Sequence, residues 1–152
     1  MVPGVPRDWM REVTNVFLIR HPARVIASYA AKRENPVLDD IGFRQQAELF
    51  EQVRSWGGSP VVVDSHDIRA DPETALRKLC AAIGLTFFPQ MLSWPKGGHC
   101  DDGVWARHWY GAVWQSTRFA EPEGDLPEIP EYLQPVLHSA LPHYEALKKA
   151  AI

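Results

Sequence analysis

Residues 16–30 read VFLIRHPARVIASYA, and this stretch decides the fold. Residues 16–19 are continuously apolar with β-branched and aromatic members, a pattern typical of a strand buried on both faces in a parallel α/β sheet. Pro22 suits the first turn of a helix, because the N–H of that turn has no partner within the helix. Arg20 is therefore expected where a strand ends and a helix begins.

The rest of the chain alternates between helical and strand patterns. We expect the first helix to end near Glu34, a second helix from about residue 40 to Gly57, a buried strand at residues 61–64, a polar connection at residues 65–72 and a helix at residues 73–85. After residue 86 the pattern weakens into short pieces, with an aromatic segment at residues 104–114 and a last helix near residues 138–151. This order predicts an α/β fold.

Composition excludes several classes of protein. The 152 residues fit one domain, and the net charge of -3 gives no electrostatic support for a nucleic-acid partner. Two cysteines do not make a disulfide framework, which suits a reducing compartment. No apolar stretch approaches the roughly 18 residues of a membrane span, and the start lacks a signal-peptide core. We expect a cytoplasmic protein with no membrane contact.

Arg20 and Ser28 are the first candidates for chemistry. Parallel sheets bind ligands beyond the carboxyl ends of their strands, and a guanidinium there can hold a phosphate through two hydrogen bonds. Ser28, flanked by small alanines on the expected helix, would let an anion approach closely. The alternative interpretation is that Arg20 pairs with a carboxylate and Ser28 faces water. Spacing does not decide between them.

Residues 17–29, FLIRHPARVIASY, resemble the second nucleotide-binding motif of the sulfotransferase family. The arginine, proline and serine of that motif stand here as Arg20, Pro22 and Ser28. Residues 61–85 resemble the strand, acidic connection and helix that follow in the family. The resemblance implies a three-layer P-loop NTPase-like parallel sheet with a helical C-terminal region. It also implies that Arg20 and Ser28 hold the 3'-phosphate of the donor, 3'-phosphoadenosine 5'-phosphosulfate, whose sulfuryl group passes to a hydroxyl or amine.

A later loop resembles the family's Arg-Lys-Gly triplet, which closes over the same 3'-phosphate. Pro95, Lys96 and Gly97 stand in that order here, with proline in place of the arginine. The resemblance implies that Lys96 and Gly97 are donor-binding residues. No motif identifies the small-molecule acceptor.

The sequence departs from the family at its start. It contains no Gly-rich phosphate loop, and it offers no counterpart of the family's upstream histidine base. We therefore expect an N-terminally incomplete, single sulfotransferase-like domain fragment over residues 1–152, with its core at about 14–92 and a loop and aromatic or helical region at about 93–152. Such a chain would keep mainly the 3'-phosphate half-site, with no catalytic residue assigned and little turnover alone.

Three other interpretations stay open. His99, Cys100, Asp101, Asp102 and His108 could suggest a metal site, but their spacing matches no zinc signature, so we expect a polar loop and no metal. The chain could instead be a non-catalytic fragment or interaction module that self-associates through an exposed sheet edge. It could also be another nucleotide-binding protein of the P-loop fold.

Overall fold

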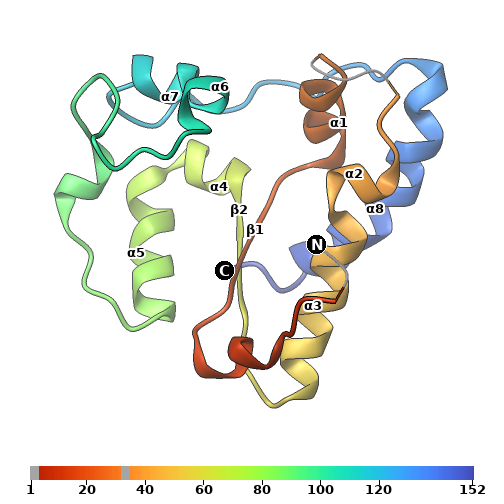
Figure 1. The fold of residues 1–152 in the computed structure, drawn as a ribbon, viewed down its shortest axis with the longest axis horizontal. Helices are drawn as coiled ribbons and strands as arrows, with labels where there is room; N and C mark the ends of the chain where they lie inside the picture. Colours follow the sequence, from red (N-terminus) through yellow and green to blue (C-terminus); the bar gives the residue numbers. More distant parts are fainter. Residues whose placement is uncertain (1–3, 32–34) are drawn as a thin grey trace.

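The computed structural model describes residues 4–31 and 35–152. At its centre lies a parallel two-stranded sheet of β1 (Val16–Ile19) and β2 (Val61–Asp64), whose residues pair one to one in order (Figure 1). The predicted α/β class with parallel strands is confirmed. The predicted three-layer P-loop-type arrangement stays a prediction, since the described sheet has two strands.

Helices and 3-10 turns make up the remaining regular structure. They are η1 (Asp8–Glu12), α1 (Pro22–Ala30), α2 (Leu38–Ile41), α3 (Phe43–Ser55), α4 (Ser65–Ala70), α5 (Pro72–Ala82), η2 (Pro89–Leu92), α6 (Ala106–Trp109), α7 (Gly111–Gln115), η3 (Glu131–Leu133) and α8 (Gln134–Lys148).

Most element boundaries follow local chemistry that the sequence signals. Pro22 lies in the first turn of α1, and the Asp71 side chain accepts a hydrogen bond from Thr74 N (3.1 Å) to cap α5. Gly84, with φ 73°, follows the end of α5, as expected for a left-handed terminating residue. The predicted end of the first helix near Glu34 lies outside the described residues.

Two predicted elements were wrong. The single helix expected up to Gly57 is divided into α2 and α3 at Gly42, which adopts a left-handed φ of 73° that glycine tolerates. The polar connection expected at residues 65–72 contains a helix, α4, because the Asp64 side chain accepts a hydrogen bond from His66 N (2.9 Å) and caps it. Both differences come from single residues with local effects.

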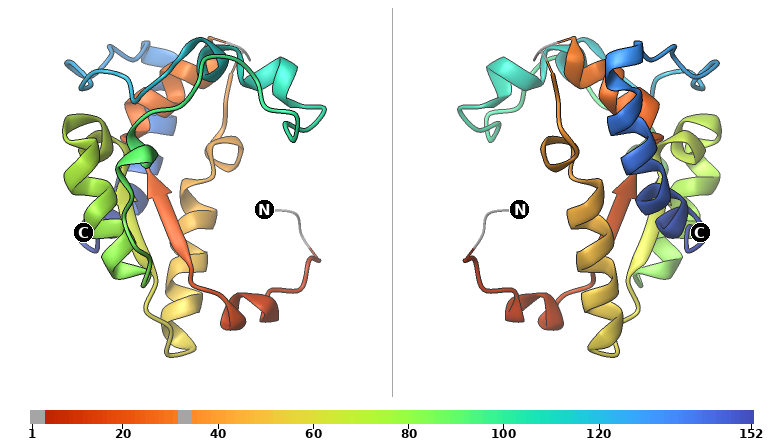
Figure 2. Two further views of the ribbon diagram at one scale, coloured as in Figure 1. Left: turned by 90° about the vertical axis from the view of Figure 1, so that its left-hand side faces the viewer. Right: turned by 90° about the vertical axis from the view of Figure 1, so that its right-hand side faces the viewer.

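The core lies between the sheet and the pair α3 and α8, whose packing places the last helix against both strands. Phe17 and Ile19 of β1 are buried there, with Phe17 meeting Phe50 of α3 edge to face at 5.7 Å. Helix α5 packs on the opposite face of β2, so helices lie on both sides of that strand (Figure 2). Every residue of β2 is consequently buried.

β1 is buried on one face only, so the expectation of a strand buried on both faces was wrong. Val16 and Leu18 are 43% and 57% exposed, respectively. The reason is that α5 covers β2, and within the described residues no element covers the neighbouring face of β1. The sheet therefore carries an apolar strip along one face.

The C-terminal end contributes to the sheet. Ile152 N donates a hydrogen bond to the carbonyl oxygen of Val62 (3.1 Å), and Ala151 forms a parallel bridge with the same residue. Residues far beyond 92 thus complete the core around β2. No helix among the described residues is long and apolar enough to cross a membrane.

Truncation of core and surface leucines tests the one-sided burial of β1. Leu147→Ala should lower the free energy of unfolding by about 2–5 kcal/mol, because Leu147 is 1% exposed and its removal leaves a cavity. Leu18→Ala should cost less than about 1 kcal/mol, because that side chain is already in water. Urea unfolding measures both values. If both variants lost the same free energy of unfolding, the face of β1 that carries Leu18 would be covered, which would contradict the one-sided burial.

Candidate functional site

The carboxyl ends of β1 and β2 lie at the same end of the sheet, where ligands of parallel α/β proteins bind. Helices α1 and α4 begin there, and the connection from α7 to α8 crosses over this end beside α1 (Figure 1). A pocket of about 290 Å³ opens between these elements. Its lining includes His21, Arg24, His66, Glu123, Leu126 and Tyr144.

Three arginines converge on Glu123 beside this pocket. Arg20, which follows β1, donates from Nε to Oε1 of Glu123 (3.0 Å) and also from Nη2. Arg69 of α4 donates from Nη1 to the same oxygen (3.0 Å), and Arg24 of α1 places Nε 2.9 Å from Oε2. The Glu123 side chain is 2% exposed, so one buried carboxylate holds three cations.

These contacts keep Glu123 ionised. Its burial alone would raise the pKa, but the hydrogen bond from Arg20 and the positive charges of Arg20, Arg24 and Arg69 outweigh burial and hold the pKa below its usual range. A carboxylate that shares three guanidinium groups is negatively charged at neutral pH. The site is thus arranged around an anion supplied by the chain itself.

The arginines also hold the backbone on both sides of Glu123. Arg24 Nη2 donates to the carbonyl oxygen of Gly124, and Arg69 Nε donates to that of Glu121 (2.9 Å). The segment around Glu123 contains no helix and no strand, since α7 ends at Gln115 and η3 begins at Glu131. The guanidinium contacts hold this segment near α1 and α4.

A second buried carboxylate lies at the end of β2. Asp64 is 1% exposed, and its Oδ2 accepts a hydrogen bond from the Tyr144 hydroxyl (2.7 Å) and lies 3.1 Å from Lys148 Nζ. Burial opposes ionisation of Asp64, but hydrogen bonds from His66 N, Tyr144 and Lys148 prevail and lower its pKa. This group ties α8 to the sheet beside the pocket.

His21 adds a neutral ring to the pocket wall. It packs edge to face against Tyr144, with ring centroids 5.3 Å apart, and its Nδ1 accepts a hydrogen bond from Ala23 N (3.2 Å). Burial, together with the nearby charge of Arg24, lowers the pKa of His21. The imidazole is consequently uncharged at neutral pH.

Arg20 and Ser28, the first two predicted site residues, have different surroundings in the structure. Arg20 follows β1, and Ser28 lies within α1. Arg20 pairs with a carboxylate, which was one of the two interpretations that its position in the sequence left open. Ser28 is exposed on α1, one helical turn after Arg24 and therefore on the same helix face. Arg24 shares Glu123 with Arg20 and lies on the face of α1 that carries Ser28.

Lys96 and Gly97, the other two predicted residues, lie on an exposed loop between η2 and α6. Gly97 has φ 116°, a conformation that strongly favours glycine, and its N–H donates to the carbonyl oxygen of Trp114 (2.9 Å). In the part of the chain that the structure describes, no hydrogen bond or ion pair joins the Lys96 side chain to Glu123.

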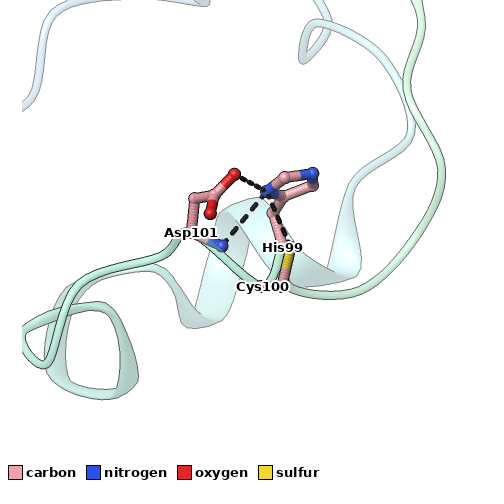
Figure 3. A group of neighbouring side chains, drawn as sticks. All are labelled: His99, Cys100 and Asp101. Carbon is pink, nitrogen blue, oxygen red and sulfur yellow. Dashed lines mark hydrogen bonds and ion pairs between the residues drawn. The ribbon is translucent and has the colours of Figure 1, made fainter.

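A small group of candidate metal ligands lies further along the same loop. Figure 3 shows the side chains of His99, Cys100 and Asp101 close together, with their ligand atoms within 4.8 Å of one another. All three are exposed, and His99 Nδ1 already accepts a hydrogen bond from Asp101 N (3.2 Å). This ring nitrogen serves a local turn, as expected for a polar loop.

Sequence reasoning missed three members of the arginine and glutamate group. Arg24 could have been found, because it follows Arg20 by four residues at the start of an expected helix. Arg69 lies in a segment that was expected to be a loop, so the direction of its side chain could not be predicted. Glu123 lies in a proline-rich passage without periodicity, which left no signal for its long-range pairing.

Comparison with known proteins shows the family of this chain. A model described as a sulfotransferase domain matches residues 1–151, so the chain belongs to the sulfotransferase domain family. In Arabidopsis thaliana, branched-chain-amino-acid aminotransferase-like proteins 1 and 2 are 32% and 29% identical to it over 145 residues. These matches cover 95% of this chain and 26% of each relative, so the chain spans about a quarter of their length. No solved structure matches significantly.

The lowered pKa of Asp64 predicts how stability depends on pH. A carboxylate with a pKa lower in the folded than in the unfolded chain stabilises the fold above about pH 4, and this contribution is lost as the pH falls through the folded pKa. Asp64→Asn should therefore lower the free energy of unfolding at pH 7 by on the order of 3 kcal/mol and flatten its decline below pH 4.

Urea unfolding between about pH 2 and pH 7 measures this effect. Asp39→Asn is the matched control, because the Asp39 side chain is 59% exposed and pairs with Arg44 at the surface. The control should follow the parent curve within about 1 kcal/mol. An Asp64→Asn curve parallel to that of the parent would contradict the assigned role of this carboxylate.

Proposed function

We propose that this chain binds the 3'-phosphate of 3'-phosphoadenosine 5'-phosphosulfate, as the donor-binding part of a sulfotransferase that acts on a hydroxyl or amine. The observation that supports this most is the convergence of three arginines at the carboxyl ends of two parallel strands. Arginine forks match phosphate oxygens in geometry and charge, and this end of a parallel sheet is where such ligands bind.

Arg20 and Ser28 have distinct roles in this proposal. Arg20 gives charge-assisted hydrogen bonds to the phosphate, and Ser28 adds a hydroxyl donor from the exposed face of α1. Lys96 and Gly97 approach from the exposed loop, where the lysine brings a charge and the glycine lets the backbone come close.

The donor site is proposed to belong to a three-layer P-loop-type sheet within one domain. The exposed apolar face of β1 supports this, because Val16 and Leu18 are residues typical of a strand covered on both faces. Sulfuryl transfer also needs a base and positive donors on the 5' side of the nucleotide. The proposal assigns no residue of this chain to those roles and expects binding without appreciable turnover.

The aminotransferase-like names of the two plant relatives do not extend to this chain. Both are called aminotransferase-like, but this chain covers about a quarter of each protein, whereas the sulfotransferase domain model matches nearly all of the chain. A second candidate function is an interaction module that uses the exposed edge of the sheet at β1, and the exposed apolar side chains of Val16 and Leu18 beside that edge favour it. Self-association in size-exclusion chromatography without nucleotide binding would favour that module.

Arginine substitution tests the proposed donor site. Arg20→Ala should weaken binding of adenosine 3',5'-bisphosphate by at least about tenfold, because charge-assisted hydrogen bonds to the 3'-phosphate are lost. Arg77→Ala is the control, since Arg77 is exposed on α5 and pairs there with Glu73. Isothermal titration calorimetry measures both affinities. Equal affinities in the two variants, or no binding by the parent chain, would reject this assignment.

A further inference from the structure

The group around Glu123 contains more positive than negative charge. Three guanidinium cations face one carboxylate, which leaves an excess of two positive charges in the group. The two oxygens of the Glu123 carboxylate also differ in their hydrogen bonds. Oε1 accepts hydrogen bonds from Arg20 and Arg69, whereas the buried Oε2 lies beside Arg24 and accepts no hydrogen bond from any described residue. The carboxylate thus balances one of the three positive charges, and one of its two oxygens accepts no hydrogen bond within the described part of the chain.

The arginines remain accessible to an anion from solution. The Glu123 side chain is 2% exposed, but the side chains of Arg20, Arg24 and Arg69 are 39%, 14% and 29% exposed. Arg24 and Glu123 both line the pocket of about 290 Å³, so an anion in this pocket can reach the Arg24 side chain. The cations are thus partly open while their present partner is enclosed.

We propose that Arg20, Arg24 and Arg69 form one binding site for a phosphate group, and that Glu123 is an internal competitor which the phosphate displaces. The inference rests on the proposed donor-binding function for the identity of the ligand, a nucleotide 3'-phosphate. It adds two arginines to the site and gives the chain a device that tunes affinity for the donor.

A phosphate monoester fits the three guanidinium groups better than a carboxylate does. It carries up to two negative charges and three free acceptor oxygens, so each arginine fork can find its own oxygen. In this proposal the Glu123 side chain rotates away from the arginines when the phosphate binds. The backbone contacts of Arg24 with Gly124 and of Arg69 with Glu121 can persist and hold the segment over the bound anion.

Charge removal at Glu123 tests the competition. Glu123→Gln should bind adenosine 3',5'-bisphosphate and inorganic phosphate about tenfold more tightly than the parent does, because the competing negative charge is gone. Glu121→Gln is the matched control, since its side chain is 82% exposed and faces Arg118 on the same segment. That control should stay within about twofold of the parent. Isothermal titration calorimetry at constant ionic strength measures both ligands.

Two further variants test the added arginines. Arg24→Ala and Arg69→Ala should each weaken binding of inorganic phosphate by about tenfold, whereas Arg77→Ala should leave it unchanged. Unchanged affinity in either site variant would overturn the three-arginine site.

The two ligands separate this inference from the proposed function. If Glu123→Gln tightens binding of inorganic phosphate and the nucleotide does not bind, the anion site stands and the donor-binding function fails. If the parent binds the nucleotide in an Arg20-dependent way but Glu123→Gln tightens neither ligand, the function stands and the competition by Glu123 is overturned.

A measurement of thermal stability covers the case in which Glu123→Gln folds poorly. Phosphate should raise the melting temperature of this variant more than that of the parent, compared with chloride at the same ionic strength, because the dianion replaces the lost carboxylate. A melting temperature lowered equally in phosphate and chloride would show a purely structural carboxylate and overturn the proposal.

Discussion

Three arginine side chains that share one buried carboxylate hold together the end of the molecule where ligands of parallel sheets bind. Arg20 comes from the end of β1, Arg24 from α1 and Arg69 from α4, so the group joins both strand ends. Glu123 brings to them a long connection without helix or strand. Arg24 and Glu123 of this group line the pocket, and the group holds the connection beside α1 and α4.

The second carboxylate has a different role. Asp64 lies at the end of β2 and meets Tyr144 and Lys148 of α8, so it fixes the last helix against the sheet. Its partners are the backbone N–H of His66 in α4 and the side chains of Tyr144 and Lys148 in α8, whereas Glu123 faces three guanidinium groups. The contrast separates a carboxylate that completes the fold from one that, in our proposal, occupies the site of a phosphate group.

Sequence reasoning predicted the elements that local chemistry determines. The apolar runs at β1 and β2, the prolines that open α1 and α5, and Gly84 after α5 are visible without tertiary information. The exposure of Val16 and Leu18 was not predictable, because it depends on which helix covers which strand. The pairing of Arg20 with Glu123 joins residues 103 positions apart, and neither spacing nor propensity signals such a contact.

The central claim, that one phosphate engages all three arginines, is tested most directly by NMR of their side-chain Nε–Hε groups during titration with adenosine 3',5'-bisphosphate. The resonances of Arg20, Arg24 and Arg69 should shift together along one binding curve, while that of Arg77 on α5 stays in place. Shifts at Arg20 alone, or none at the three arginines when the nucleotide is bound, would contradict the account.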